Sequence, residues 1–544
     1  MDSLLCGLAA NPALPSGLLD RLIEVAAAVA DTDAVSGDRA SEECASGGHR
    51  TSGNSAFDDS AFGDCASDDP ASDDCASGDP ASDDLTFGDL AFDLARRADL
   101  SRAQAVALAS RDEGAGVRLA YGGVLTAADV DPTAQPLVAL ALLDEGRGDP
   151  RWARLLAADP VVRHREKLAA CPGLPPDVVE TLASDPDTEV VAELALWAGP
   201  DVAARLGGHP HPGVRRAVAC NEATPPAVLA ALVTGSGPVP GDPCDDFHAS
   251  TAYDVVRAAL ANPATPAEVA VRFADHPSTP LRRALATHPG LPPEAYARLA
   301  VDSAPGVRAD LAENPAVDGT PLRVLAGDPD PDVRRRVAQH PRVPLDVLPG
   351  LAATTRTGGA PLPRIASATA AEVQGLARSP QAVVRMLLAR RRDLPAGVRD
   401  ALADDPDAKV VSAVASHPGL SETRLHVMVD RLGVQVLSGV AVNPDATPAL
   451  LERVARHRPP VRKALREVAR HPRATAPALL SCLTDDRARP LAAGHPALPP
   501  AFVVELLSDT DEQVAQAAAA NPALPVAVMS RLLGRHTGAS RPQR

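Results

Sequence analysis

A sequence unit of about 26 residues recurs along most of this 544-residue chain, and this repetition limits the fold more than any other feature. In each clear copy an Asn or His stands directly before a proline, at a position that we call the anchor. Self-similarity at a fixed period is typical of stacked repeats, in which each unit buries its apolar surface only against its neighbours. The clearest anchors are Asn262, His288, Asn314, His340, His417, Asn443, His471, His495 and Asn521.

Each repeat carries the pattern of two short helices. An apolar residue stands seven residues before the anchor and another follows four residues later, as Val333 and Val337 do before His340. This spacing predicts one apolar stripe on a two-turn helix. The proline after the anchor ends that helix, and a Leu-rich segment behind it predicts a second helix. Since helices this short are marginal alone in water, we predict an all-α solenoid whose repeats stabilise one another.

The pattern V-R-x-x-x-A-x-[HN]-P-x-[LT]-P, followed by a Leu-rich helix and an Asp-rich turn, resembles the leucine-rich repeat variant family. HEAT-like repeats are the nearest general class. The resemblance implies a right-handed α-solenoid (superhelix) of about eighteen two-helix repeats, with one helix of each pair a 3-10 helix. Some members of the family also hold an iron–sulfur cluster on cysteines. The eight cysteines here form no C-x-x-C pair, so the cluster is not carried over, and we predict no cofactor or metal.

The formal net charge of −17 is concentrated in one segment, because seventeen Asp or Glu residues but only two Arg lie between Asp31 and Asp93. Such a self-repelling segment buries little apolar surface, so we predict a disordered acidic loop. We therefore divide the chain into a first repeat or N-terminal cap (1–30), an acidic low-complexity insertion (31–88), a repeat solenoid (89–534) and a C-terminal tail (535–544). Within the solenoid, residues 235–250 and 354–364 are predicted surface loops.

Two sets of residues are candidate sites. At the anchors, the interchange of His and Asn suggests one structural role, a side chain that hydrogen-bonds the turn backbone before Pro. Neighbouring repeats lie about 8–10 Å apart, too far for successive anchors to share a metal ion. The second set is a series of arginines six residues before the anchor. They form either a structural Asp–Arg ladder that links repeats or a basic strip that binds a partner, and their members are Arg165, Arg215, Arg282, Arg308, Arg334, Arg385 and Arg489.

For function, we predict a non-enzymatic scaffold that binds an unknown protein or peptide along the curved face of the repeats. The sequence contains no G-x-x-x-x-G-K-[ST], G-x-S-x-G or H-E-x-x-H motif. Nucleic-acid binding through the arginines is the alternative, opposed by the negative net charge and by an aromatic content of only 2%. An iron–sulfur redox role is disfavoured by the cysteine spacing.

Location and assembly give two further expectations. The chain has no apolar stretch of 18 residues and no basic region typical of a secretory signal, so we expect a cytoplasmic protein without membrane association. The apolar N-terminus, with Leu4, Leu5 and Leu8, is a candidate surface for self-association.

Overall fold

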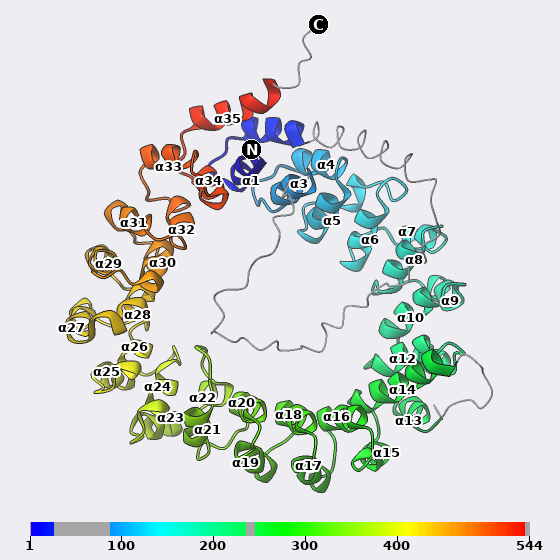
Figure 1. Ribbon diagram of the computed structural model, residues 1–544. Coiled ribbons are helices and arrows are strands. Elements are labelled where there is room, and N and C mark those ends of the chain that lie inside the picture. Colours follow the sequence, from blue (N-terminus) through cyan, green and yellow to red (C-terminus); the bar gives the residue numbers. More distant parts are fainter. Residues whose placement is uncertain (1, 27–86, 236–244, 539–544) are drawn as a thin grey trace. The chain divides into compact units, whose positions relative to one another are not determined.

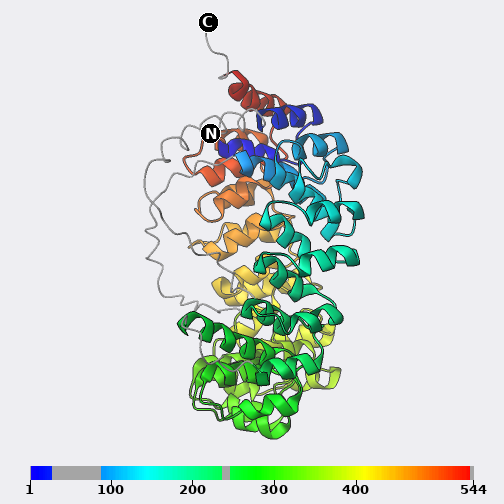
Figure 2. The ribbon, with the colours of Figure 1, turned by 90° about the vertical axis from the view of Figure 1, so that its right-hand side faces the viewer.

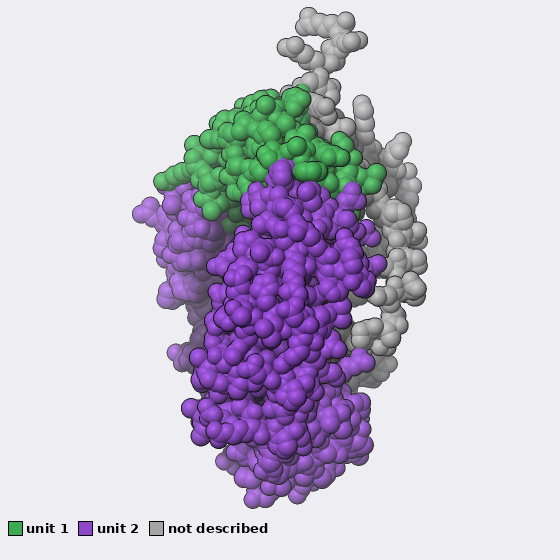
Figure 3. Space-filling model, turned by 90° about the vertical axis from the view of Figure 1, so that its left-hand side faces the viewer, with its two compact units in different colours: residues 1–118, 500–544 green, residues 119–499 purple. Residues whose placement is uncertain are grey.

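Residues 2–26, 87–235 and 245–538 are described by the computed structural model, and every regular element among them is a helix. The predicted all-α fold is therefore confirmed. The predicted acidic insertion falls almost wholly outside the described residues. Two compact units divide the chain: unit 1 comprises residues 1–118 and 500–544, and unit 2 comprises residues 119–499 (Figure 3).

Unit 2 consists of repeats with a first and a second helix each, and the two kinds of helix form two layers (Figure 1). Successive first helices pack side by side, for example α16 on α18 and α18 on α20. The first helices are α6 (Pro136–Asp144), α8 (Val162–Ala169), α10 (Thr188–Trp197), α12 (Pro212–Cys220), α14 (Asp245–Ala261), α16 (Thr279–Thr287), α18 (Pro305–Glu313), α20 (Pro331–Gln339), α22 (Pro363–Ala366), α24 (Ala382–Ala389), α26 (Ala408–Val414), α28 (Leu437–Val442), α30 (Arg462–Arg470) and α32 (Arg489–Ala493). The second helices are α7 (Pro150–Leu156), α9 (Pro176–Ala183), α11 (Pro200–Leu206), α13 (Pro226–Gly235), α15 (Ala267–Ala270), α17 (Pro293–Leu299), α19 (Thr320–Ala326), α21 (Leu348–Thr354), α23 (Ala370–Ala377), α25 (Ala396–Ala403), α27 (Glu422–Leu432), α29 (Pro448–Ala455) and α31 (Ala476–Cys482).

Helix α20 illustrates how the sequence forms a first helix. The Asp330 side chain caps its start by accepting a hydrogen bond from the Asp332 N–H at 2.8 Å. Val333 and Val337 are fully buried, so the predicted apolar stripe faces the core. The helix ends at His340, whose backbone is extended (φ −69°, ψ 131°) because Pro341 follows.

The structure corrects three details of the expected architecture. Both helices of a typical pair are α-helices, and 3-10 geometry is confined to η2 (Ala127–Asp129), η3 (Val271–Phe273) and η4 (Gly433–Gln435) within the described part of the chain. Helix α14 begins at Asp245, inside the segment predicted as the loop 235–250. Within the predicted loop 354–364, helix α22 begins at Pro363 and has only four residues. The first-helix layer is therefore interrupted between α20 and α24.

Unit 1 brings together repeats from both ends of the sequence. Its helices are α1 (Asp2–Ala10), a helix over residues 16–26, α3 (Phe87–Ala95), α4 (Arg102–Ala109), the start of α5 (Glu113–Tyr121), α33 (Pro500–Leu506), α34 (Glu512–Ala519) and α35 (Val526–Gly538). Helix α1 packs against α34 and α35 on one side and against α3 on the other, and the blue and red helices adjoin in both ribbon views (Figures 1 and 2). The first repeat therefore continues the stack that the C-terminal repeats begin.

This packing corrects the hypothesis of self-association through the N-terminal leucines. Leu5 and Leu8 have exposed fractions of only 4% and 0%, and Leu4 is half-buried. Gly7 lies so close to α34 that a Cβ atom at this position would overlap the Gln516 carbonyl oxygen. The chain's own C-terminal repeat covers the surface that appeared open in the sequence.

Candidate functional site

The asparagine anchors bind each repeat to the repeat before it. In each of four anchors the Nδ2 amide donates to two backbone carbonyl oxygens of the preceding repeat, at 2.7–2.9 Å. For Asn314 these are the carbonyls of Ala286 and His288, while its Oδ1 accepts the Ala316 N–H. The same bonds are made by Asn11, Asn262, Asn314 and Asn443. For Asn521, the Oδ1 accepts the Ala523 N–H at 2.8 Å.

The histidine anchors replace this amide with one imidazole. In His340, Nε2 lies 2.9 Å from the Asn314 carbonyl oxygen and Nδ1 accepts the Arg342 N–H at 3.0 Å. Because Nδ1 accepts, the proton of the neutral ring is on Nε2, which donates to the carbonyl. The contact from Nε2 to the preceding repeat spans 2.6–3.1 Å in His288, His340, His417, His471 and His495. Burial lowers the pKa of His288, His340, His417 and His495 below its ordinary value and favours this neutral form.

Arginine occupies the anchor in two repeats. Arg391 donates through Nη1 to the Ile365 and Ala368 carbonyls, and its Nε contacts Asp393 at 2.6 Å. Arg97 bonds in the same way to the Ala9 and Asn11 carbonyls and to Asp99. The sequence signal for this variant is Arg-x-Asp in place of Asn-Pro or His-Pro, and it identifies Arg97 as an anchor that the repeat pattern alone missed.

Four of the seven predicted ladder arginines form buried ion pairs with an aspartate 20 residues later. Arg308, for example, contacts Asp328 with Nε at 2.6 Å and Nη2 at 2.9 Å, and its Nη1 donates to the Asp302 carbonyl at 2.7 Å. The exposed fractions of the two side chains are 13% and 5%. The four pairs are Arg165–Asp185, Arg282–Asp302, Arg308–Asp328 and Arg385–Asp405.

The remaining ladder positions differ. Arg215 and Arg334 donate to the carbonyls six residues earlier, but Gly235 and Thr354 stand where the partner aspartate would be. Arg489 begins helix α32. Burial tends to raise the pKa of the paired Asp328, but Arg308 and the Asp330 N–H outweigh this effect and lower it.

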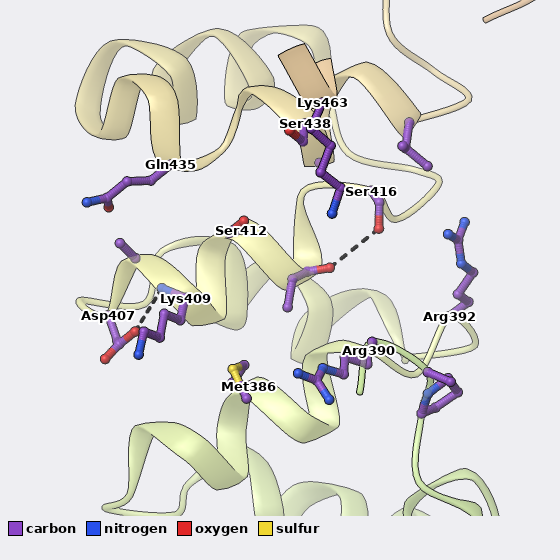
Figure 4. A pocket seen from close by; sticks show the side chains of 17 residues that line it. Met386, Arg390, Arg392, Asp407, Lys409, Ser412, Ser416, Gln435, Ser438 and Lys463 are labelled. Atoms are coloured by element: carbon purple, nitrogen blue, oxygen red, sulfur yellow. Dashed lines mark hydrogen bonds between the residues drawn. The ribbon is translucent and has the colours of Figure 1, made fainter. Parts of the chain in front are cut away.

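A hollow of about 1020 Å³ opens where the first-helix layer is interrupted. It is lined by residues 359–361 of the interrupting loop and by side chains of α24, α26, α28 and α30, the last through Lys463 (Figure 4). Its lining combines Met386 and small residues with the hydroxyls of Ser412, Ser416 and Ser438. The interrupting loop and α22 stand in place of a full first helix, and the hollow lies beside them.

Four cations line this hollow: Arg390, Arg392, Lys409 and Lys463. None of them has an ion-pair partner among the described residues, and the one carboxylate of the lining, Asp407, accepts the Lys409 backbone N–H at 2.8 Å. Arg392, Lys409 and Lys463 are exposed. Arg390 is half-buried and donates to the Thr357 hydroxyl at 3.2 Å, and burial lowers the pKa of its guanidinium. Repeat spacing did not identify this site, because its cations occupy different positions in their repeats.

Two other kinds of site were searched within residues 2–26, 87–235 and 245–538. No group of three or more His, Cys, Asp or Glu side chains there is arranged to hold a metal ion. None of the helices in those ranges combines the length and the apolar character needed to cross a bilayer.

Comparisons with known proteins give structural likenesses alone. No protein-family model and no curated protein matches the chain. A solved leucine-rich repeat variant "with a novel repetitive protein structural motif" is 20% identical, with 48% of this chain and 87% of that chain covered and a TM-score of 0.25. A Pds5–Scc1 complex, described in relation to cohesin function, is 11% identical, with 83% and 74% covered and a TM-score of 0.21. The paired, layered helices described above make the chain itself a helical-repeat protein.

Proposed function

We propose that this chain is a non-enzymatic interaction scaffold in the cytoplasm, which binds a protein or peptide partner on the layer of first helices. One observation carries the proposal: the first helices of unit 2 form a continuous layer, and that layer contains a large polar hollow with four cations outside any ion pair. The anchors and the paired ladder arginines are occupied by contacts between and within repeats. They support the surface, and the side chains around the hollow are the ones available to a partner.

The nucleic-acid alternative depended on the ladder arginines as a basic strip. Four of these guanidiniums are held by buried aspartates, so they would have to break an ion pair before contacting a phosphate. We therefore expect the full chain to bind a duplex DNA of about 20 base pairs no more tightly than roughly 10⁻⁴ M at physiological salt. A tighter complex whose affinity falls steeply with salt would favour the alternative.

The scaffold proposal is tested by capture followed by mapping. The full chain is used to capture partners from its native extract, and each retained protein is then purified and tested for direct binding. A photo-reactive amino acid is placed at Ser412 in the first-helix layer or at the exposed Val427 on second helix α27. We expect a direct partner to cross-link from position 412. A partner that cross-links only from position 427, or retention of nucleic acid alone, would contradict the proposal.

A further inference from the structure

The hollow differs in charge balance from a neighbouring part of the same layer. On α16, α18 and α20, arginines that face the layer have carboxylate partners: Arg283 contacts Asp310 at 2.7 Å, and Arg336 contacts Glu313 at 2.8 Å and Asp332 at 2.9 Å. Around the hollow the corresponding carboxylates are missing, as no described acidic group pairs with Arg390, Arg392, Lys409 or Lys463. Two of the three lysines in the whole sequence lie here. The lining therefore has an excess of positive charge that the chain balances elsewhere.

The spread of these cations indicates the shape of the ligand. They belong to repeats whose anchors run from Arg391 to His471, which are three repeat steps apart. With about 8–10 Å per step, the cations extend over roughly 25–30 Å. This is too long for one phosphate group, but it matches about eight residues of extended peptide at about 3.3 Å each. Ser412, Ser416, Ser438 and Gln435 add hydrogen-bonding groups along the same path.

The chemistry of the lining favours a peptide over a nucleic acid. No aromatic side chain is among the lining residues, so the hollow has no platform on which bases could stack. Lys409 and Lys463 are exposed point charges, and Arg390 and Arg392 present guanidiniums suited to carboxylates. Met386 and small residues such as Gly439 and Ala360 leave room for a backbone beside them.

We propose that the hollow binds an acidic segment of a partner protein, rich in Asp and Glu and extended across the repeats from α24 to α30. This inference rests on the proposed scaffold function and assigns the partner chemistry to one surface. The four cations bind its carboxylates, and the serine hydroxyls and Gln435 bind its backbone.

The test measures binding of a fluorescent 12-residue peptide of alternating Glu and Ser to the full chain, by anisotropy at low salt. A peptide in which Gln replaces Glu, inorganic phosphate and duplex DNA serve as comparison ligands. The site variant is Arg392→Ser, Lys409→Ser and Lys463→Ser together. The matched control removes the same charge at three exposed second-helix arginines, as Arg298→Ser, Arg323→Ser and Arg453→Ser.

We expect the acidic peptide to bind the full chain, with affinity reduced at least about tenfold in the site variant and within about twofold in the control. Equal loss in both variants would overturn the inference, as would stronger binding of DNA or equal binding of the Gln peptide. The same measurements are made on a chain lacking residues 31–86. Binding only to that shortened chain would make the protein's own acidic segment the occupant and overturn a partner in trans. If a captured partner binds the site variant unchanged, the scaffold proposal stands and this inference fails.

Discussion

At the scale of single residues, the anchor shows how three unlike side chains can do one job. Asn, His and Arg each donate to backbone carbonyls of the preceding repeat, as Asn314, His340 and Arg391 do. Asn and His also accept an N–H two residues ahead, whereas Arg has no acceptor and instead pairs with an aspartate there, such as Asp393. The position requires buried hydrogen bonds of fixed geometry, because an unpaired buried carbonyl is costly.

The histidine anchors predict a dependence of stability on pH. The folded-state pKa of His288, His340, His417 and His495 lies below the unfolded value of 6.5, so the unfolded chain binds more protons once the pH falls below 6.5. Their contribution is complete above 6.5 and is lost as the pH falls toward the folded pKa. We expect the melting temperature to drop by about 3 °C or more between pH 7.5 and 5.5.

Replacing these four histidines with Asn should shrink that drop while preserving stability at pH 7.5, because Asn makes the anchor bonds without titrating. Differential scanning calorimetry of both proteins at the two pH values makes the comparison. An unchanged drop in the fourfold variant would show that other groups cause it.

The buried ion pairs give a second prediction at this scale. In Asp328→Asn the Arg308 guanidinium remains buried without its counter-charge, and we expect a loss of about 3–5 kcal/mol in the free energy of unfolding. The control is Asp346→Asn, which removes an exposed partner of Arg323 and should cost less than about 1 kcal/mol. Urea unfolding followed by circular dichroism measures both. Equal effects would mean that burial of the Arg308 pair adds nothing.

At the scale of elements, close helix packing depends on small side chains at defined positions. Ala286, Ala312 and Ala338, each two residues before an anchor, are almost completely buried. Glycine appears where even a methyl group is too large, as Gly7 does on α1 against α34. These positions fix how closely one first helix can approach the next.

Gly7→Ala tests this packing. The added methyl overlaps Gln516 and Ala519 on α34, so we expect a loss of about 1–3 kcal/mol and faster amide hydrogen exchange in α1 and α34. Gly17→Ala is the matched control, since a Cβ there meets nothing within 4 Å. Unchanged exchange in Gly7→Ala would show that α1 and α34 do not need this contact.

The sequence predicted the elements better than the site, for physical reasons. Repetition exposed the apolar stripe, the prolines and the interchange of Asn and His, because these recur at fixed offsets. The partner of Arg308 was less visible, since Asp328 stands 20 residues away and is read only when both series are aligned. The hollow was not predictable from the repeat, because it depends on a missing first helix and on Lys409 and Lys463, which share no such period.

At the scale of the whole molecule, the N-terminal repeat and the C-terminal repeats are parts of one packed unit. Asn11 donates to the Ala519 and Asn521 carbonyls across more than 500 residues of sequence, as if the first repeat followed the last one. An ordinary solenoid needs polar capping repeats at its ends. Here α1 and α34 cover each other, which explains the apolar character of the N-terminus.

Deleting residues 2–26 should therefore uncover α34. We expect rapid hydrogen exchange over Glu512–Ala519 and self-association that increases with concentration, because the apolar face of α34 then lacks its neighbour. Sedimentation velocity and exchange measurements follow both effects. A chain lacking residues 31–86 retains α1 and is the control. A monomeric deletion variant with full protection in α34 would contradict this account.

The bond between Asn11 and the Asn521 repeat also sets an order of events during synthesis. At about 5–20 residues per second, the ribosome needs roughly 25–100 s to make the 510 residues that separate them. During that time the first repeat has been translated, but the helix that will cover Leu5 and Leu8 does not yet exist. The nascent chain therefore carries an exposed apolar surface for most of its translation, and its N-terminus reaches its final packing only after the C-terminal repeat leaves the ribosome.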